Sequence, residues 1–222
     1  MIDVQTMVIN NEESEDAAII GSDDGLSEVL ELVTLAASSD APVLITGETG
    51  TGKNLVAKAI HSRSAAKQGP FIRVNCLSFP ENPAEADPHE EGDFTSATPG
   101  IRGLFETAAG GTLFFDEIGE TPPYLQGKLL GFIKDNKARR FSGEFERTVS
   151  VRIIASSNAD LEKAVGGAFR KDLYYRLNAI RIHIPPLRER RRDIPALCGH
   201  LLKEIAGGTD VMLPDSELQK LV

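Results

Sequence analysis

A glycine-rich stretch of the sequence carries the residue types that bind phosphate groups. It reads GETGTGKN and lies between an apolar run and a segment with helical periodicity. Glycines let the backbone adopt positive φ angles and approach a ligand closely, and free N–H groups at a helix N-terminus attract anions. Lys53 adds a positive charge for the outer phosphates, so the pattern indicates a P-loop in which Asn54 replaces the usual Ser or Thr. The candidate phosphate-binding residues are Gly47, Glu48, Thr49, Gly50, Thr51, Gly52, Lys53 and Asn54.

Two acidic residues form the second candidate group. Asp116 and Glu117 directly follow the apolar run 112–115. At the carboxyl end of a buried strand they would stand beside phosphates held by the P-loop. Asp116 can then hold Mg²⁺, and Glu117 can activate the attacking water as a general base. Each motif alone also fits an ordinary turn that binds nothing, but the two together favour a nucleotide site.

Strands and helices must alternate along the chain to place these two motifs side by side. Apolar runs predict strands at 43–45, 71–75, 112–116, 151–155 and 180–184. Apolar residues at helical spacing predict helices at 26–37, directly after the P-loop, at 122–133, at 159–165 and at 169–177. Such alternation is typical of an α/β fold with a parallel sheet. The charged stretch 136–149 is expected to form a hairpin or a loop.

The composition indicates a soluble protein that is not itself a DNA reader. The chain has 222 residues, of which 41% are hydrophobic, and a net charge of −9. Its apolar runs are shorter than the roughly 18 residues of a membrane span, and its N-terminus lacks a secretory signal. A segment that gripped DNA by itself would more often be basic. Two cysteines and four scattered histidines give neither a disulfide framework nor a metal-ligand pattern, and we expect a cytoplasmic protein.

Several stretches together resemble the central ATPase domain of the sigma-54-dependent transcriptional activators, the bacterial enhancer-binding branch of the AAA+ proteins. The resemblance runs from about Ile19 to Leu202, and its most specific stretches are GETGTGK at 47–53, VNC at 74–76, GGTLFFDEIGE at 110–120, FRKDLYYRLN at 169–178 and PPLRERRRDIP at 185–195. It implies an AAA+ P-loop fold with a five-stranded parallel sheet flanked by helices over residues 18–186. The start of an incomplete helical lid would occupy 187–222, and 1–17 would be a flexible lead-in or linker stub.

The resemblance also implies roles for individual residues in binding ATP and Mg²⁺ and in hydrolysis. Ile20–Gly21 would lie near the adenine, and Ser157–Asn158 would sense the nucleotide after the fourth strand. Asn75 would be a switch that holds or releases Glu117, although the same residue also fits a simple turn at the strand end. Asp116 would bind Mg²⁺.

A ring of identical subunits follows from the same resemblance. Arg170 and Arg176 match the arginines that reach the γ-phosphate of the next subunit, so hydrolysis would require assembly as a hexamer or heptamer. Phe94 and Thr95 match the residues of a loop that contacts the sigma-54 factor of RNA polymerase. DNA would be contacted only through a domain absent from this chain, and no membrane would be involved.

Two departures in the loop 92–97 keep an alternative open. Asp93 and Ser96 differ from the family's GAFTGA motif. The chain would then be either an ATPase that remodels sigma-54 RNA polymerase, or an ATP-binding regulatory module whose sigma-contact loop is defective. An unrelated P-loop enzyme such as a small-molecule kinase would need an acceptor site, and the sequence offers no candidate for one.

Overall fold

A five-stranded parallel sheet forms the centre of the molecule, as the sequence predicted. The computed structural model describes residues 8–9, 19–21, 25–79, 81, 104–135, 137–142, 145–158, 160–207, 214 and 216. In sheet order, the parallel strands are β3 (Phe71–Asn75), β4 (Thr112–Asp116), β7 (Arg152–Ser157), β2 (Val43–Thr46) and β8 (Ile180–His183). Because β2 and β4 flank β7, the carboxyl ends of three neighbouring strands meet at one edge of the sheet.

A short edge strand extends this sheet. β1 (Val8–Ile9) pairs antiparallel with β3 and makes the sheet six-stranded. It falls within the segment 1–17, whose other residues lie outside the described ones. The predicted loop 92–97, with Phe94 and Thr95, also lies outside the described residues.

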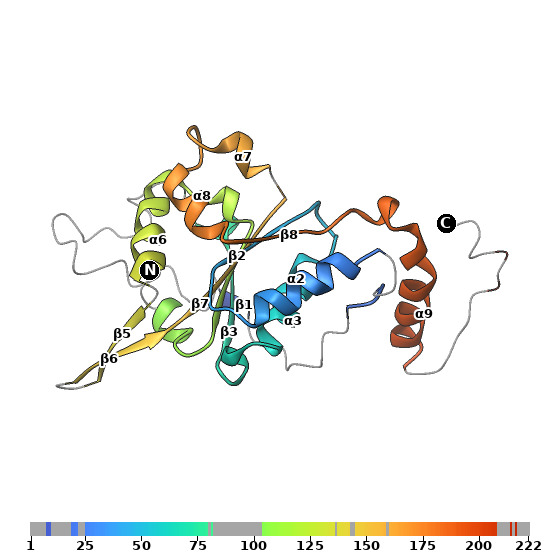
Figure 1. Cartoon of the computed structure of the whole chain (residues 1–222), viewed down its shortest axis with the longest axis horizontal. Coiled ribbons are helices and arrows are strands. Elements are labelled where there is room, and N and C mark those ends of the chain that lie inside the picture. The colour runs from blue at the N-terminus through green and yellow to red at the C-terminus, as the bar shows by residue number, and fades with distance from the viewer. Residues whose placement is uncertain are drawn as a thin grey trace.

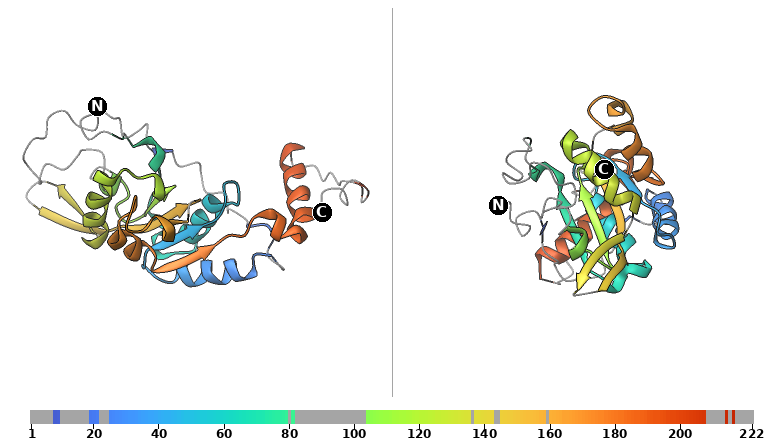
Figure 2. Two further views of the ribbon diagram at one scale, coloured as in Figure 1. Left: turned by 90° about the horizontal axis from the view of Figure 1, so that it is seen from above. Right: turned by 90° about the vertical axis from the view of Figure 1, so that its left-hand side faces the viewer.

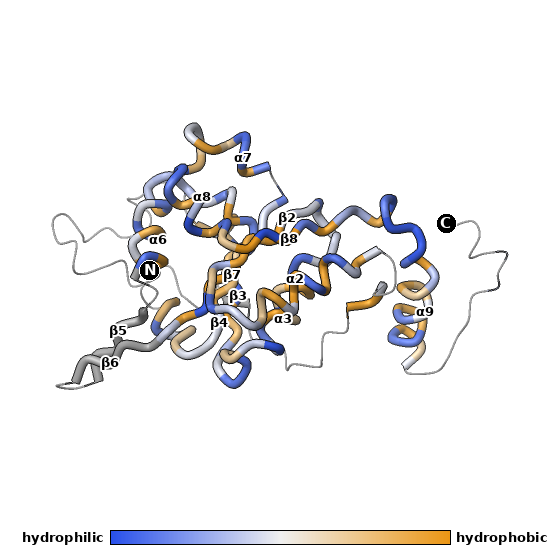
Figure 3. Tube along the Cα trace, in the orientation of Figure 1, coloured by the Kyte–Doolittle hydropathy of each residue, from blue (hydrophilic) through white to orange (hydrophobic). Residues whose placement is uncertain are grey.

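Two hydrophobic layers cover the two faces of the sheet. Successive side chains of a strand point to opposite faces, so Leu44 joins one layer while Val43 and Ile45 join the other. The layer of Val43 contains residues of α2 and α3, and the layer of Leu44 contains residues of α6 and α8. The main α-helices are α2 (Ser27–Ala37), α3 (Lys53–Ser62), α6 (Pro123–Asp135), α7 (Leu161–Ala164), α8 (Lys171–Leu177) and α9 (Ile194–Ile205). Figure 3 shows the hydrophobic stretches along the central strands.

The remaining elements lie outside this layered core. β5 (Lys137–Ser142) and β6 (Phe145–Ser150) form an antiparallel hairpin, which confirms one of the two predictions for that stretch. Figures 1 and 2 show this hairpin at one end of the molecule and α9 at the other. Short 3-10 turns are η1 (Ala65–Gln68), η2 (Cys76–Ser78), η3 (Ile118–Glu120), η4 (Leu187–Glu189) and η5 (Arg191–Asp193). Among the described residues, no helix combines the length and apolar composition that crossing a membrane requires.

Two helices begin two residues later than the sequence predicted. α7 begins at Leu161 rather than 159, and α8 begins at Lys171 rather than 169. Phe169 forms an isolated bridge with Val165, and the backbone of Arg170 is extended, with φ −69° and ψ 130°. The N–H of Arg170 donates to the side chain of Gln126 on α6, at 2.8 Å. In a helix, the same N–H would have donated to a backbone carbonyl instead.

Candidate phosphate-binding and catalytic site

The glycine-rich loop joins β2 directly to α3. Gly50 and Gly52 have φ angles of 85° and 100°, and Gly52 is the N-cap of α3. At both positions a Cβ would meet open space, so the backbone angle and not crowding favours glycine there. At Gly47 (φ 156°) a Cβ would also lie 2.7 Å from the carbonyl oxygen of Ile184. The loop therefore has the bend that a phosphate cradle at a helix N-terminus requires.

Lys53 connects the glycine-rich loop to the acidic strand tip. Its side chain is 6% exposed, and its Nζ donates hydrogen bonds to the carbonyl oxygens of Gly47 at 2.9 Å and Glu48 at 3.2 Å. The same Nζ forms an ion pair with Oε1 of Glu117 at 3.2 Å. The two motifs that the sequence singled out therefore meet at one end of the sheet.

Asp116 is held from both neighbouring strands. On one side, Arg73 of β3 donates to its Oδ2 from Nη2 at 2.6 Å and from Nε at 3.1 Å. On the other side, the hydroxyl of Ser156 of β7 donates to its Oδ1 at 2.6 Å. Neither Arg73 nor Ser156 was a sequence-predicted site residue. The carboxylate is thus fixed at the tip of β4 with both oxygens engaged.

Glu117 directs its carboxylate toward the glycine-rich loop. Its Oε2 accepts the backbone N–H of Asn158 at 2.7 Å, and its Oε1 faces Lys53. Asn158 in turn lies with its Nδ2 3.4 Å from the hydroxyl of Thr49. The carbonyl oxygen of Ser157, a buried residue, accepts the N–H of Gly47 at 3.3 Å. The end of β7 consequently contacts both the phosphate loop and the candidate base.

Asn75 lies beside the acids but is engaged elsewhere. It pairs with Asp116 in the register of β3 and β4. Its side-chain oxygen accepts the N–H of Leu77 at 3.1 Å and so caps η2. Among the hydrogen bonds of the described residues, none joins Asn75 to Glu117. The turn interpretation of this residue therefore describes the arrangement seen, and its role as a switch stays a prediction.

The two predicted arginines lie apart from this cluster. Arg170 pairs with Asp172, from Nε at 3.1 Å and Nη2 at 2.9 Å, and its hydrogen bond lowers the pKa of the Asp172 carboxyl below its usual value. Arg176, at the other end of α8, lies with Nη2 3.4 Å from the carbonyl oxygen of Lys134. Both side chains are at the surface. Within the described part of the chain they contact their own helix and α6 rather than Lys53 or Glu117.

The segment between β8 and α9 is fastened to the phosphate loop by two arginines. Arg190 is 8% exposed and donates from Nη2 to the carbonyl oxygen of Thr51 at 3.0 Å and from Nε to that of Pro185 at 3.2 Å. On the surface, Nη1 of Arg188 donates to Oε2 of Glu48 at 2.7 Å, and this hydrogen bond lowers the pKa of the Glu48 carboxyl.

Gly21, one of the two predicted adenine neighbours, lies against the same segment. Ile20 is half-buried, and Gly21 has φ 105°. A Cβ at Gly21 would lie 2.5 Å from Cγ of Asp193, and Oδ2 of the same carboxylate lies 3.6 Å from Nη1 of Arg190. The backbone at Gly21, the start of α9 and the phosphate loop are therefore close neighbours.

Replacing Arg190 with lysine is expected to weaken nucleoside triphosphate binding about threefold to tenfold. This loss corresponds to part of the contribution of a charge-assisted hydrogen bond. A peptide unit is planar and trans, so the Arg190 contact to the Thr51 carbonyl points the Gly52 N–H in the opposite direction, away from Arg190. Lysine keeps the charge, but its single ammonium nitrogen replaces a planar fork whose separate nitrogens reach the carbonyl oxygens of Thr51 and Pro185. Titration with a fluorescent nucleotide measures the effect. The matched control is Arg192→Lys, at an exposed position of the same basic run; equal affinities for the two variants would contradict the expectation.

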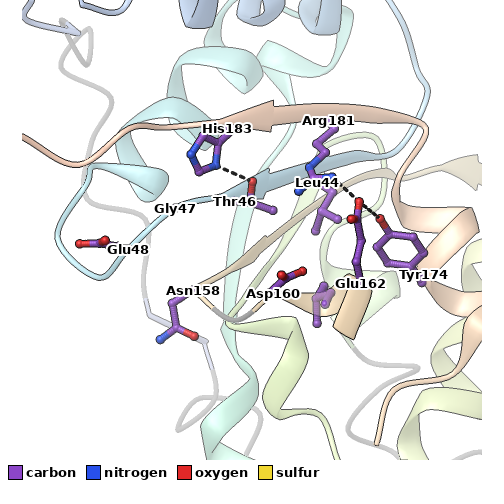
Figure 4. A pocket seen from close by; sticks show the side chains of 11 residues that line it. Leu44, Thr46, Gly47, Glu48, Asn158, Asp160, Glu162, Tyr174, Arg181 and His183 are labelled. Carbon is purple, nitrogen blue, oxygen red and sulfur yellow. Dashed lines mark hydrogen bonds and ion pairs between the residues drawn. The ribbon is translucent and has the colours of Figure 1, made fainter. Parts of the chain in front are cut away.

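A pocket of about 240 Å³ borders the site on the side of α7 and α8 (Figure 4). It reaches from Glu48 and Asn158 to Arg181 and Tyr174, whereas Lys53, Asp116 and Glu117 do not line it. Its charges are largely paired within the chain, because Glu162 accepts from Tyr174 at 2.9 Å and pairs with Arg181. The pocket is therefore a neighbour of the candidate site and not part of the Lys53 cluster.

Comparison with known proteins agrees with this geometry. The chain matches the family described as the Sigma-54 interaction domain over residues 19–183, which is more than half of its length. It is 48% identical over 189 residues to the Nif-specific regulatory protein of Herbaspirillum seropedicae, covering 84% of this chain and 35% of that protein. Crystal structures of NtrX from Brucella abortus in complex with ADP and with ATP give TM-scores of 0.71 and 0.69, both at 32% identity, covering 89% of this chain and 44% of NtrX. The chain thus spans about a third of the length of the Nif-specific regulatory proteins.

Proposed function

The chain belongs to the family of sigma-54 interaction domains, and from this premise we propose that it binds ATP with Mg²⁺ and hydrolyses it in a ring of identical subunits, using the reaction to remodel sigma-54 RNA polymerase. The observation that carries the proposal is the convergence of Lys53, Glu117 and the Asn158 N–H within hydrogen-bonding distance. Phosphoryl transfer to water needs a cationic amide cradle, an acid and a polar strand end at one site.

The oxygen ligands near the cradle fit a magnesium ion. Mg²⁺ prefers oxygen ligands and keeps several of its waters. Asp116 offers a carboxylate whose oxygens already accept from Arg73 and Ser156, so it suits a contact made through a metal-bound water. Asn54, in the first turn of α3, offers an amide oxygen in place of the usual hydroxyl. When bound, the ion would screen the charge of the phosphates.

The residues of the chain would act in a defined order. Phosphates entering the cradle would attract Lys53 away from Glu117, because the phosphate groups carry more negative charge than one carboxylate. Glu117, freed from the ion pair, would accept the proton of the attacking water. Arg170, which directly precedes α8, and Arg176 on α8 are both exposed. They would be supplied to the site of the adjacent subunit and stabilise charge in the transition state. The solved structures of the relative NtrX with ADP and with ATP support nucleotide binding.

A ring with shared sites is expected to give a specific ATP turnover that rises with protein concentration. Single subunits would lack the arginines in trans, so the turnover per subunit should increase at least tenfold between dilute and assembled protein. Steady-state hydrolysis measured across a dilution series, alongside the mass of the particles, tests this. Turnover per subunit that stays constant while the ring dissociates would contradict a shared site.

Phe94 and Thr95 are proposed to contact sigma-54, as in the family the chain belongs to. Protein trapped with ADP and aluminium fluoride is expected to capture sigma-54, and Phe94→Ala should reduce that capture about tenfold or more, because few residues supply most of the energy of an interface. The control is Leu35→Ala, which removes an exposed apolar side chain from α2. The family match does not favour the regulatory-module alternative. Active hydrolysis without capture of sigma-54 would support that alternative instead.

A further inference from the structure

The backbone of Glu117 is held in an unfavourable conformation. Its φ and ψ are 56° and 54°, and it is the only non-glycine residue with positive φ in the described part of the chain. The left-handed region is uncommon for residues other than Gly, Asn and Asp, and it persists where surrounding contacts fix it. A side chain on such a residue points in a direction that an ordinary strand residue would not reach. The direction of the candidate base therefore depends on whatever fixes this backbone.

The hydroxyl of Ser156 makes two hydrogen bonds at this point. It donates to Oδ1 of Asp116 at 2.6 Å, and it accepts the backbone N–H of Glu117 at 3.2 Å. A hydroxyl has one proton and two lone pairs, so both bonds can exist at once. The residue is fully buried, and water cannot replace either bond.

The sheet places Ser156 between the two motifs. It pairs with Ile45 of β2 in the parallel register, and Ala155 before it pairs with Phe115 of β4. Ser156 therefore stands next to Asp116, at the point where β4 ends and the chain turns. Arg73 holds the other oxygen of Asp116 from β3, so this acid keeps one anchor if the serine is lost. The N–H of Glu117 has no such second anchor among the hydrogen bonds of the described residues.

We propose that Ser156 is a positioning residue for ATP hydrolysis, whose hydroxyl fixes the backbone of Glu117 and thereby aims its carboxylate. The inference rests on the proposed function and deepens it. The inference separates catalysis from binding, because the hydrogen bonds of the Ser156 hydroxyl among the described residues go to Asp116 and Glu117 and not to the glycine-rich loop or Lys53. Removing its hydroxyl should disturb the catalytic step and leave nucleotide binding intact.

Ser156→Ala is expected to lower kcat about tenfold to a hundredfold, as misplacing a catalytic group by about 1 Å does, with the Kd for an ATP analogue changed less than about threefold. The matched control is Ser64→Ala. Ser64 is also a buried serine whose hydroxyl donates one hydrogen bond, to His61 at 2.8 Å, and accepts one, from the N–H of Ala66 at 3.2 Å, but it caps η1. Both variants lose comparable hydrogen bonds, so kcat should fall only in the first.

Hydrogen exchange provides a readout that does not depend on hydrolysis. The Glu117 amide should exchange at least about tenfold faster in Ser156→Ala than in unaltered protein, and Ser64→Ala should leave it unchanged. Unchanged exchange in Ser156→Ala would overturn the inference even if the protein hydrolyses ATP. If the Glu117 amide exchanges faster in Ser156→Ala but the unaltered protein binds ATP without hydrolysing it, the anchoring role of Ser156 is supported and the proposed function is wrong.

Three further outcomes would also overturn the inference. They are full kcat in Ser156→Ala, an equal fall of kcat in both variants, and a loss of nucleotide affinity that matches the loss of kcat. If Ser156→Ala does not fold, Ser156→Cys offers a weaker donor of similar shape. Its kcat should be lowered about threefold to tenfold with Kd unchanged, and a cysteine variant with full kcat would contradict the role equally.

Discussion

Replacing Glu117 with glutamine is expected to lower ATP turnover about a thousandfold while leaving ATP bound, because a positioned general base contributes about 10²–10⁴-fold. Glutamine keeps the shape of the side chain and can still accept the Asn158 N–H, but it cannot take a proton from water. It also ends the ion pair with Lys53, which leaves that lysine free for the phosphates. ATP affinity should therefore stay the same or rise.

Glu120→Gln is the matched control for this variant. Glu120 lies three residues further along, in η3, and is exposed. The measurements are steady-state phosphate release and nucleotide affinity by titration. A Glu117→Gln protein that retains turnover within about threefold of the control would mean that another group activates the water.

Mixing two inactive variants is expected to restore hydrolysis. Arg176→Ala should by itself lower turnover about a thousandfold, since an arginine supplied in trans contributes about 10³–10⁵-fold. A subunit with this change still has Glu117, and a Glu117→Gln subunit still has Arg176. An interface is competent when the subunit that holds the nucleotide has Glu117 and its neighbour has Arg176. In a ring of identical heterologous interfaces, random mixing in equal amounts meets both conditions at about a quarter of the interfaces. Turnover should therefore recover to about that fraction.

A second mixture serves as the control. Lys53→Ala and Glu117→Gln both damage the subunit that holds the nucleotide, so no pairing of these two variants creates an intact site. This mixture should stay inactive while the first recovers. Differently tagged subunits show whether mixed rings form, and mixed rings of the first pair without hydrolysis would contradict arginines acting between subunits. The same mixture made with Arg170→Ala tells whether both arginines act in this way.

The arrangement of the strands could be predicted because it follows from local patterns. Apolar runs that end in Gly47 and in Asp116 belong to buried parallel strands, and such strands end at one edge of a sheet. The hairpin at 136–149 could be narrowed only to a hairpin or a loop, since its residues carry charge where a buried strand would be apolar. The late start of α8 was missed because it depends on Gln126, a residue of another helix.

The contacts that complete the site could not be read from the chain. At the end of β7, the resemblance pointed to Ser157 and Asn158, and Asn158 does bond Glu117 through its backbone N–H, but the hydroxyl that bonds Asp116 and the Glu117 N–H belongs to Ser156. Neighbouring side chains of a strand point to opposite faces, so the choice depends on the register with β4. The role of Arg73 could not be predicted either, because this residue lies within an ordinary strand pattern. Only the pairing of β3 with β4 reveals that it reaches Asp116.

The attachment of Arg190 to the Thr51 carbonyl has a consequence for the far end of the molecule. The same short segment leads into α9, where Leu201 and Ile205 are 52% and 83% exposed. If nucleotide binding depends on how this segment holds the loop, thermodynamic reciprocity follows: whatever docks on α9 and tilts it changes the affinity for nucleotide, and nucleotide changes the affinity of that docking by the same factor. The exposed part of α9 would thereby respond to nucleotide at the phosphate loop.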